Sequence, residues 1–376
     1  MSHIKLGLFF EKIHDRLPTE LIFIDILKEQ FECQIFDSRY LYDQKYCQEF
    51  IQENDILLPH LFSLRVASNS KKCGHYEYYS ENYRQLILQG MRIIEILSDI
   101  QKPVCCLNLR SDWYSETENF WELIPKNWYL LGGIQRGYLN ENPQQEFFFN
   151  DMEINITLGN QYFSDNQIIP IRHLLSDEEI STKRIPKKYD FSVLGVFYAR
   201  RKRIYQKAKT LPIRMYRIWF LHRLRKMLNR YHKRYYWSNS LLNYFFNQAL
   251  RHSIISYTDG SELDMFIRKY LEIPSSYALL LCHPLARMDD YGFIENQHYI
   301  VCDEEHLGEQ LQWLLNDHQM REKIVHQSFE MVSQKYSEAK VISQLKDLFS
   351  LLKENRFYGC YYQKGELIFK EEPDEK

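Results

Sequence analysis

Short apolar runs alternate with amphipathic stretches along the first half of the chain. The apolar runs predict strands, because consecutive apolar residues over so few positions are typical of strands buried on both faces. They lie at Ile4–Phe10, Cys33–Phe36, Asp55–Leu61, Pro103–Leu109 and Trp128–Ile134. Between them, apolar residues at helical spacing predict helices at Pro18–Gln30, Tyr46–Gln52 and Tyr78–Ile100 and a helical piece at Phe120–Ile124. Strands that alternate with helices indicate a parallel sheet in a doubly wound α/β domain.

The same alternation returns in the second half, after a polar segment without helical period between residues 140 and 176. A basic linker at Lys183–Lys188 leads into a predicted strand at Tyr189–Phe197. Pro212 suits the first position of a helix, and the apolar stripe after it predicts a helix to about residue 231. Further strands are predicted at His252–Tyr257, Tyr277–Cys282 and Tyr299–Cys302, and helices at Glu262–Ile273, Glu304–Leu315, Met320–Tyr336 and Glu338–Lys353.

These two halves predict two α/β domains in tandem. We expect an N-terminal domain over residues 1–175, a C-terminal domain over residues 185–352 and a tail over residues 353–376. The length of 376 residues agrees with two domains of roughly 150 residues each. Two such domains would leave a ligand cleft between them, outside the carboxyl ends of their strands.

The formal net charge of −2 conceals a strongly basic block. Residues 191–258 contain 15 Lys and Arg and no Asp or Glu, which favours an anionic partner at that place. Within the block, residues 212–237 interleave aromatic and basic side chains. They fit a domain helix whose apolar stripe joins the core, or a helix that lies on an anionic membrane surface. Nucleic acid is not expected, because no RNA-binding motif accompanies the basic and aromatic residues.

The ends and the cysteines of the sequence bear on its compartment and cofactors. The N-terminus lacks a secretory signal, and the longest uncharged apolar stretches have about half the length that a membrane span needs. The eight cysteines include no CxxC pair and no zinc-like spacing, so reduced thiols without a metal site are expected. We therefore expect a cytoplasmic protein, or one bound peripherally at the inner face of the membrane.

A turn and a predicted helix after the strand at 252–257 form the most informative segment. Ser261 and Asp264 fit a capping box, and a helix that starts there would offer free backbone N–H groups to an anion. Arg268 and Glu272 lie four residues apart and therefore share a helix face. The helix dipole disfavours a negative charge near a helix C-terminus. A glutamate at such a place suggests a carboxylate that is kept there to accept hydrogen bonds from hydroxyl groups. The alternative is an ordinary surface ion pair between these two residues.

The sequence around this helix resembles a known family. The run IRKYLEIPSSYALLLCHP, the run DYGFIENQHYIVCDEEHLGEQLQWLLND and a closing helix that ends in QKYS are similar to the C-terminal domain of GT-B glycosyltransferases, in particular the CgeB-like, family 1-type group. The resemblance covers about residues 189–340, and the N-terminal half matches only in its alternation of strands and helices. It implies two Rossmann-like domains that face each other across a cleft. It also implies metal-independent transfer of a sugar from a nucleotide-diphosphate donor to a saccharide acceptor, lipid-linked or free, in bacterial polysaccharide or glycoconjugate synthesis.

The resemblance also implies roles for individual residues. Glu272 matches the glutamate that holds the ribose hydroxyls of the donor, and Arg268 matches a basic residue that faces the diphosphate. Residues 192–201 look like the opening strand and loop of the donor domain, where arginines suit a pyrophosphate through bidentate contacts. The expected donor-binding residues are Arg200, Arg201, Tyr257, Gly260, Ser261, Arg268 and Glu272.

Two positions depart from the family pattern. Met265 stands where many retaining enzymes carry a second acidic residue, and Tyr277 stands where relatives have a small residue close to the donor. These departures support an alternative, a non-catalytic GT-B-like protein that binds or assembles with a partner. The nucleotide sugar would be a co-substrate, and neither a metal ion nor another cofactor is expected.

An inverting enzyme would need a general base from the N-terminal domain. His14 follows the first predicted strand, His60 ends the third, and Asp112 follows the strand at 103–109. We expect His14 and Asp112 as candidate catalytic residues, although a single such residue in a loop is also typical of a structural or solvated side chain.

Overall fold

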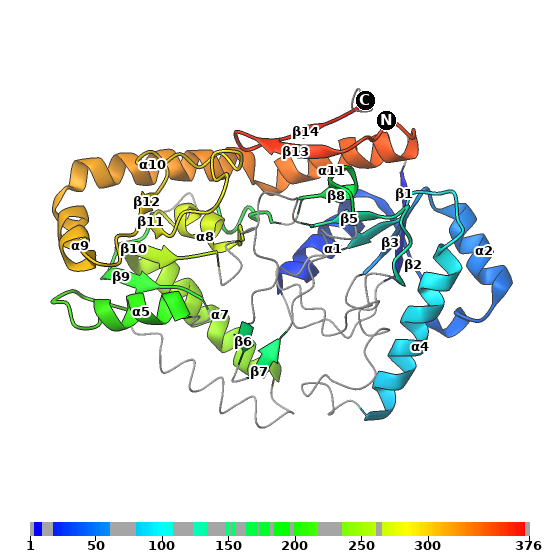
Figure 1. The fold of residues 1–376 in the computed structure, drawn as a ribbon, viewed down its shortest axis with the longest axis horizontal. Coiled ribbons are helices and arrows are strands. Elements are labelled where there is room, and N and C mark those ends of the chain that lie inside the picture. The colour runs from blue at the N-terminus through cyan, green and yellow to red at the C-terminus, as the bar shows by residue number, and fades with distance from the viewer. Residues whose placement is uncertain are drawn as a thin grey trace. The chain divides into compact units, whose positions relative to one another are not determined.

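The computed structural model describes residues 4–9, 18–60, 80–107, 123–133, 147–149, 152–154, 163–171, 173–180, 184–195, 199–216, 235–260 and 265–372. The chain divides into two compact units, each with its own parallel sheet (Figure 1). The first unit comprises Met1–Arg172, Ile342–Tyr362 and Leu367–Lys376, and the second comprises His173–Val341 and Gln363–Glu366.

The sheet of the first unit is parallel throughout its described strands. β1 (Lys5–Phe9) lies between β2 (Glu32–Ile35) and β3 (Ile56–Pro59), and β4 (Cys105–Leu107), β5 (Tyr129–Leu131) and β8 (Ile168–Ile169) follow in that order. Parallel bridges from Leu57 to Val104 and from His60 to Leu107 join the two groups of strands. The order is therefore β2-β1-β3-β4-β5-β8, and the five strands predicted from apolar runs are confirmed.

Helices that the amphipathic pattern predicts accompany this sheet. They are α1 (Pro18–Gln30), α2 (Gln44–Glu53) and α4 (Ser80–Leu97), and short turns of 3-10 helix lie at η2 (Ser38–Tyr40) and η6 (Asp165–Gln167). Asp43 caps α2 by accepting a hydrogen bond from the backbone N–H of Tyr46. At the other end, Lys102 Nζ donates to the carbonyl oxygens of Ile51, Gln52 and Asn54 at 2.6–2.7 Å. A short antiparallel pair, β6 (Phe147–Phe149) and β7 (Met152–Ile154), was not predicted.

The last helix and the C-terminal hairpin contribute to the first unit. α11 (Glu338–Lys353) has the bounds that the sequence predicts, and it is followed by β13 (Cys360–Gln363) and β14 (Glu366–Phe369). Phe349 of α11 is fully buried, and its ring meets Phe31 edge-on at 5.2 Å between centroids. Lys353 forms an ion pair with Asp55 at 2.9 Å. The contacts thus assign residues 342–362 to the first unit, whereas the sequence pattern places residues up to 352 in the second domain.

The sheet of the second unit contains β9 (Tyr189–Val193), β10 (Ser253–Thr258), β11 (Leu279–Cys282) and β12 (Ile300–Val301), all parallel. Met215 adds a parallel bridge to Phe191 on the other side of β9, and the backbone N–H of Tyr216 donates to the carbonyl of Phe191 at 3.0 Å. The helix predicted from Pro212 onward is therefore wrong for residues 213–216. They extend beside β9, where Arg214 is held by Asp190 at 2.6 Å.

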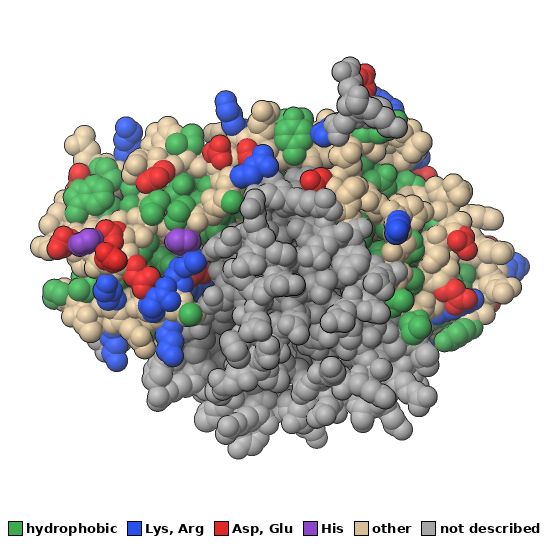
Figure 2. All heavy atoms as spheres, in the orientation of Figure 1, with side chains coloured by type: hydrophobic (Ala, Val, Ile, Leu, Met, Phe, Trp, Pro, Cys, Tyr) green, Lys and Arg blue, Asp and Glu red, His purple; other side chains and the backbone are tan. Residues whose placement is uncertain are grey.

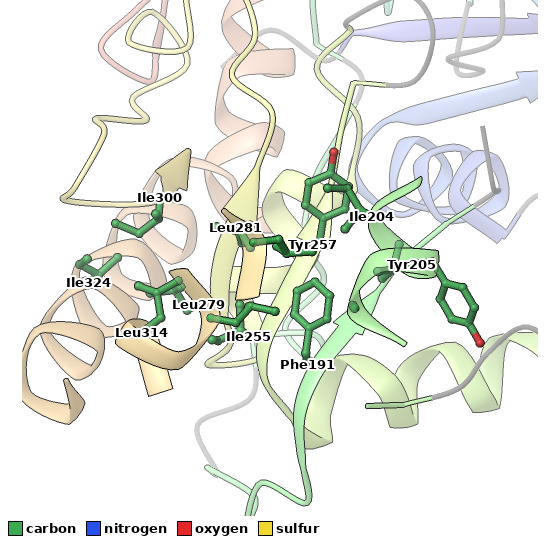
Figure 3. Close-up of a cluster of buried hydrophobic side chains, with 14 of the residues drawn as sticks. Phe191, Ile204, Tyr205, Ile255, Tyr257, Leu279, Leu281, Ile300, Leu314 and Ile324 are labelled. Atoms are coloured by element: carbon green, nitrogen blue, oxygen red, sulfur yellow. The ribbon is translucent and has the colours of Figure 1, made fainter. Parts of the chain in front are cut away.

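Five helices are described in this unit: α5 (Ala199–Ala208), α7 (Tyr235–His252), α8 (Lys269–Ser275), α9 (Leu307–Asn316) and α10 (His318–Lys335). The core is a cluster in which Phe191, Ile255 and Leu279 of the strands meet Ile204 of α5 and Leu314 of α9 (Figure 3). α5 and α9 thus cover one face of the sheet. The connection through α5 runs across the sheet from β9 to residue 215, whereas the connections from residue 215 to β10 and from β10 to β11 run in the opposite direction. Right-handed crossovers therefore place α7 and α8 on the opposite face from α5.

Candidate functional site

Strand order locates the candidate site. In the second unit, the chain runs from β9 to the bridge at Met215 on one side and then crosses to β10 on the other side of β9. The segments that leave the carboxyl ends of β9 and β10 therefore diverge to opposite faces of the sheet. Such a reversal of strand order leaves a crevice outside the carboxyl ends, where doubly wound proteins bind ligands. In this unit the corresponding place, called the crevice below, lies at Gly195 after β9 and at Asp259–Gly260 after β10.

Gly195 brings two basic side chains close to the backbone at the end of β9. Its φ of +103° lies in the region that favours glycine. A Cβ atom there would lie 2.5 Å from Nη1 of Arg201 and 2.7 Å from Cε of Lys269. Arg201 comes from the first turn of α5, and Lys269 is the first residue of α8. The absence of a side chain at this position therefore allows cations from two helices to reach one strand end.

Arg201 is buried and forms an ion pair with Asp259. Its Nη2 lies 2.6 Å from Oδ1 of Asp259 and donates to the carbonyl oxygen of Asp259 at 2.7 Å. Both residues are 1% exposed. A short, charge-assisted pair at this depth is the arrangement that offsets the desolvation of two charges. The pair fixes the start of α5 to the carboxyl end of β10, across the crevice.

A second, exposed group of charges lies over α5 and α9, where Figure 2 shows basic and acidic side chains side by side. Arg203 Nε donates to Oε1 of Glu304 at 2.7 Å, and Lys207 Nζ donates to the backbone carbonyl of Glu304. The Arg203 guanidinium lowers the pKa of Glu304 below its ordinary value, and the charge of Arg200 adds to this effect. Arg200 is partly buried in the first turn of α5.

Arg268 and Glu272 are paired, as their spacing suggests. Nη1 of Arg268 lies 3.3 Å from Oε1 of Glu272, and both side chains are 14% exposed. The same guanidinium donates to the backbone carbonyl of Leu174 at 3.3 Å and pairs with Glu179. Arg268 is thus directed toward the 173–180 segment, while its neighbour Lys269 lies against Gly195.

The helix that carries these residues starts later than the sequence predicts. Residues 265–267 are not helical, and α8 begins only at Lys269, so the helix start predicted from Ser261 is wrong. Glu272 consequently lies in the first turn of a seven-residue helix, where the helix dipole favours a carboxylate. Pro274 lies inside α8 instead of ending it. The unfavourable interaction between Glu272 and the helix dipole that the sequence suggests is therefore absent. The ion pair with Arg268 accounts for the position of Glu272.

The other predicted donor residues have different surroundings. Tyr257 is 1% exposed and belongs to the core below α5, where burial raises the pKa of its hydroxyl (Figure 3). Gly260 follows β10 at the carboxyl edge and accepts a hydrogen bond from the backbone N–H of Met265 at 2.8 Å. Met265 itself is buried at 1% exposure. Ser261, His14 and Asp112 lie outside the described residues.

Tyr277 lies at the opposite edge of the sheet from this site. It lies two residues before β11, at the amino end of a parallel sheet, while Gly195 follows the carboxyl end of β9. Its ring stacks on Phe329 of α10 with 4.0 Å between centroids, and the Arg184 guanidinium lies 5.7 Å from the ring centroid. Its φ of 53° places it in the left-handed region. The expectation that Tyr277 adds bulk close to a donor is therefore wrong for a donor at the carboxyl edge.

The first unit has the same reversal of strand order, between β1 and β3. His60 directly follows β3 there, is 2% exposed, and donates its backbone N–H to the carbonyl of Phe9 at 3.3 Å. The sequence pattern correctly places this histidine at a strand's carboxyl end. Over the described part of the chain, no cluster of three or more His, Cys, Asp or Glu could hold a metal ion, and no helix is long and apolar enough to span a membrane.

Sequence reasoning missed two residues of this site, Asp259 and Lys269. Asp259 carries a usable signal, since it is an acid directly after a buried strand and before Gly260. Lys269 carries a weaker signal in the sequence, because it is one of two adjacent basic residues with Arg268. Only its approach to Gly195 in the structure distinguishes it from Arg268.

The chain resembles known proteins in structure and not in sequence. No protein-family model and no curated protein sequence matches it. A glycosyltransferase from Rickettsia africae superposes with a TM-score of 0.53 at 10% identity, over 94% of this chain and all of that one. HepE from Anabaena superposes with TM-scores of 0.51 in complex with UDP (9% identity) and 0.50 in complex with UDP-glucose (10% identity), in both cases over 93% of this chain and all of that one.

The chain has the GT-B fold. Its two doubly wound units correspond to the two Rossmann-like domains that the sequence resemblance predicts. The neighbours are glycosyltransferases, and membership of the CgeB-like group stays a prediction. In this GT-B chain, the second unit carries the Gly195 turn, the Arg201–Asp259 pair and Lys269 around one crevice.

Proposed function

We propose that this protein is a glycosyltransferase that takes a sugar from a nucleotide-diphosphate donor, with a UDP-sugar as the first candidate. The observation that carries the proposal is the approach of Lys269 to Gly195 at the carboxyl edge of the second unit, where the buried Arg201–Asp259 pair holds the start of α5. A sugar nucleotide puts its diphosphate at such an edge, where the strand order reverses and a cation is at hand.

The chemistry of the reaction suits this arrangement. When the glycosyl bond breaks, negative charge develops on the departing nucleoside diphosphate, and cations fixed before the reaction stabilise it without reorganisation. Glu272 would accept hydrogen bonds from the ribose hydroxyls. HepE, which shares the fold, was crystallised with UDP and with UDP-glucose, and this supports uridine as the nucleoside.

The acceptor would bind the first unit. We propose a saccharide or lipid-linked saccharide in bacterial polysaccharide or glycoconjugate synthesis, with no metal ion required. A base for an inverting reaction would come from the carboxyl edge of that unit's sheet, where His60 follows β3. His14 and Asp112 remain candidates for the same task, and residues 212–237 remain a candidate for contact with an anionic membrane surface.

A second candidate function is donor binding without transfer. Met265 favours it, because this position holds a buried apolar side chain where many retaining relatives carry an acid. A protein of this kind would bind a nucleoside diphosphate and release no UDP from any sugar nucleotide.

Calorimetry with UDP, GDP, ADP and dTDP tests the binding step, and release of the nucleoside diphosphate from the matching sugar nucleotide tests transfer. Glu272→Gln should weaken binding of the preferred nucleotide about 10-fold or more, because a hydrogen bond to a charged acceptor is lost. The matched control is Glu330→Gln on α10, where Glu330 is exposed and pairs only with His326 among the contacts described. If a folded wild-type protein binds none of the four nucleotides, the proposal is refuted.

A further inference from the structure

Four basic residues of the second unit are candidates to contact the diphosphate. The resemblance favours Arg200, Arg201 and Arg268, and the geometry at Gly195 adds Lys269. The charge of Arg200 acts on Glu304, in the exposed group of charges over α5 and α9. We propose that Lys269 makes the direct contact and that Arg201 is a positioning residue that holds the crevice together. This inference rests on the proposed function, since it concerns the same nucleotide site.

Arg201 is unsuited to direct contact because of its burial and its partner. It is 1% exposed, and one nitrogen of its guanidinium is shared between the side chain and the backbone carbonyl of Asp259 at 2.6 and 2.7 Å. A phosphate would have to draw the guanidinium away and leave the carboxylate of Asp259 buried without its cation. The cost of that exchange is large. In addition, the negative charge of Asp259 lies beside the cation and largely cancels its field at the ligand.

Arg268 is directed elsewhere. Its guanidinium spans the carbonyl of Leu174, Glu179 and Glu272, with two carboxylates around one cation. A diphosphate beside this group would meet more negative than positive charge. Arg268 is therefore better placed to orient Glu272 than to bind an anion.

Lys269 combines position, exposure and reach. Its Cε lies at 2.7 Å from the place of the missing Gly195 Cβ, so its ammonium terminates a flexible stem beside the carboxyl end of β9. The residue is only partly buried, and Nζ lies 5.7 Å from the centroid of the Phe246 ring on α7. An ammonium group with three donors is a compact point charge that binds phosphate oxygens well.

The two roles predict different effects on different ligands. A residue that touches the diphosphate adds nothing to the binding free energy of uridine. It adds some to that of UMP and most to that of UDP, because its contribution depends on the charge of the ligand. A residue that only holds the crevice in shape affects all three ligands together. The ratio of the dissociation constants of uridine and UDP therefore separates direct contact from a structural effect.

The experiment measures the binding of uridine, UMP and UDP by calorimetry to the full chain and its variants. Lys269→Met should weaken UDP binding about 10- to 100-fold, which is the loss of one or two charge-assisted hydrogen bonds, and should leave uridine binding unchanged. Lys269→Arg should recover most of the UDP affinity. The matched control is Lys209→Met, which removes the same charge from an exposed position beyond the far end of α5.

The outcomes separate this inference from the proposed function. If the wild-type protein binds UDP and Lys269→Met binds it equally well, the assignment of Lys269 is overturned and the proposed function stands. If Lys269→Met loses uridine and UDP affinity in the same proportion, the residue is structural and the inference is also overturned. If the wild-type protein binds no UDP, both fail. Circular dichroism and thermal unfolding of each variant check that the fold is intact.

Discussion

The Arg201–Asp259 pair gives a quantitative test of the fold around the crevice. Each charge has about 1% of its surface exposed, and Nη2 and Oδ1 lie 2.6 Å apart. Arg201→Met keeps much of the side-chain volume and leaves the carboxylate of Asp259 in the interior without its cation. Breaking a buried pair in this way costs about 3–5 kcal/mol. We expect a loss of this size in the free energy of unfolding of the second unit.

The double variant Arg201→Met/Asp259→Leu distinguishes the pair from the packing around it. With both charges removed, no ion remains buried without a partner, and such replacements are often neutral or stabilising. The double variant should therefore be more stable than Arg201→Met alone. The coupling energy from the complete cycle should reach a few kcal/mol, because the two residues touch.

Hydrogen exchange measured by mass spectrometry is the appropriate assay, because two compact units need not unfold together. Peptides that contain β10 report the second unit, and peptides that contain β3 report the first as an internal control. The reasoning would be refuted if each single variant lost less than about 1 kcal/mol, or if the losses of the two single variants simply added.

Three smaller changes test neighbouring features. Gly195→Ala forces an L residue to a φ of +103° against Arg201 Nη1, so we expect a loss of roughly 1–3 kcal/mol and weaker UDP binding; unaltered stability in urea would contradict the turn argument. Tyr277→Ala removes a ring stacked on Phe329 and should cost about 0.5–1.5 kcal/mol beyond the loss of buried area. Its UDP affinity should be unchanged in calorimetry, because the residue lies at the amino edge. Burial lowers the pKa of Lys187 from 10.5 to about 7. Between these values the unfolded chain binds a proton that the folded chain has released, so this group makes stability rise with pH across that window. Urea unfolding at several pH values should show that the free energy of unfolding rises less with pH for Lys187→Met than for the wild-type protein. Equal slopes of the free energy of unfolding against pH would overturn the lowered pKa of Lys187.

Much of the sheet was predictable because its strands are parallel and buried. A strand covered on both faces must be apolar at every position, and such runs are visible without knowledge of the fold. The bounds of α1 and α11 were predicted as the structure has them. Both helices carry apolar residues at helical spacing, and the predicted start of α1 falls at Pro18, a residue suited to a helix beginning.

The errors fall where local signals support more than one conformation. The apolar stripe after Pro212 has helical spacing, yet Arg214–Tyr216 extend along β9 because an ion pair between Arg214 and Asp190 and backbone hydrogen bonds hold them there. These partners lie some 24 residues apart in sequence. α7 was not predicted from the mixture of aromatic, polar and apolar residues at 235–252.

The position of the candidate site in the fold was predictable, but the pairing of its charged side chains was not. The arginines after the first strand of the second unit, and the turn after its next strand, identify the carboxyl edge of the sheet, where the strand order reverses. The pairing of Arg201 with Asp259 joins residues 58 apart and depends on which strands are neighbours. The approach of Lys269 to Gly195 depends in addition on α8 starting at Lys269, and a capping signal at Ser261 suggested an earlier start.

The basic block shows why local charge in the sequence differs from the charge a ligand meets. Residues 191–258 contain no acid, but acids outside that interval neutralise part of it. Asp190 pairs with Arg214, Asp259 with Arg201, and Glu304 with Arg203. Each of these carboxylates lies in a strand or just past a strand end, so the sheet brings them to the arginines. A count of cations therefore overstates the field in the crevice, and a partly exposed lysine outside the block can matter more to an anion than a buried arginine within it.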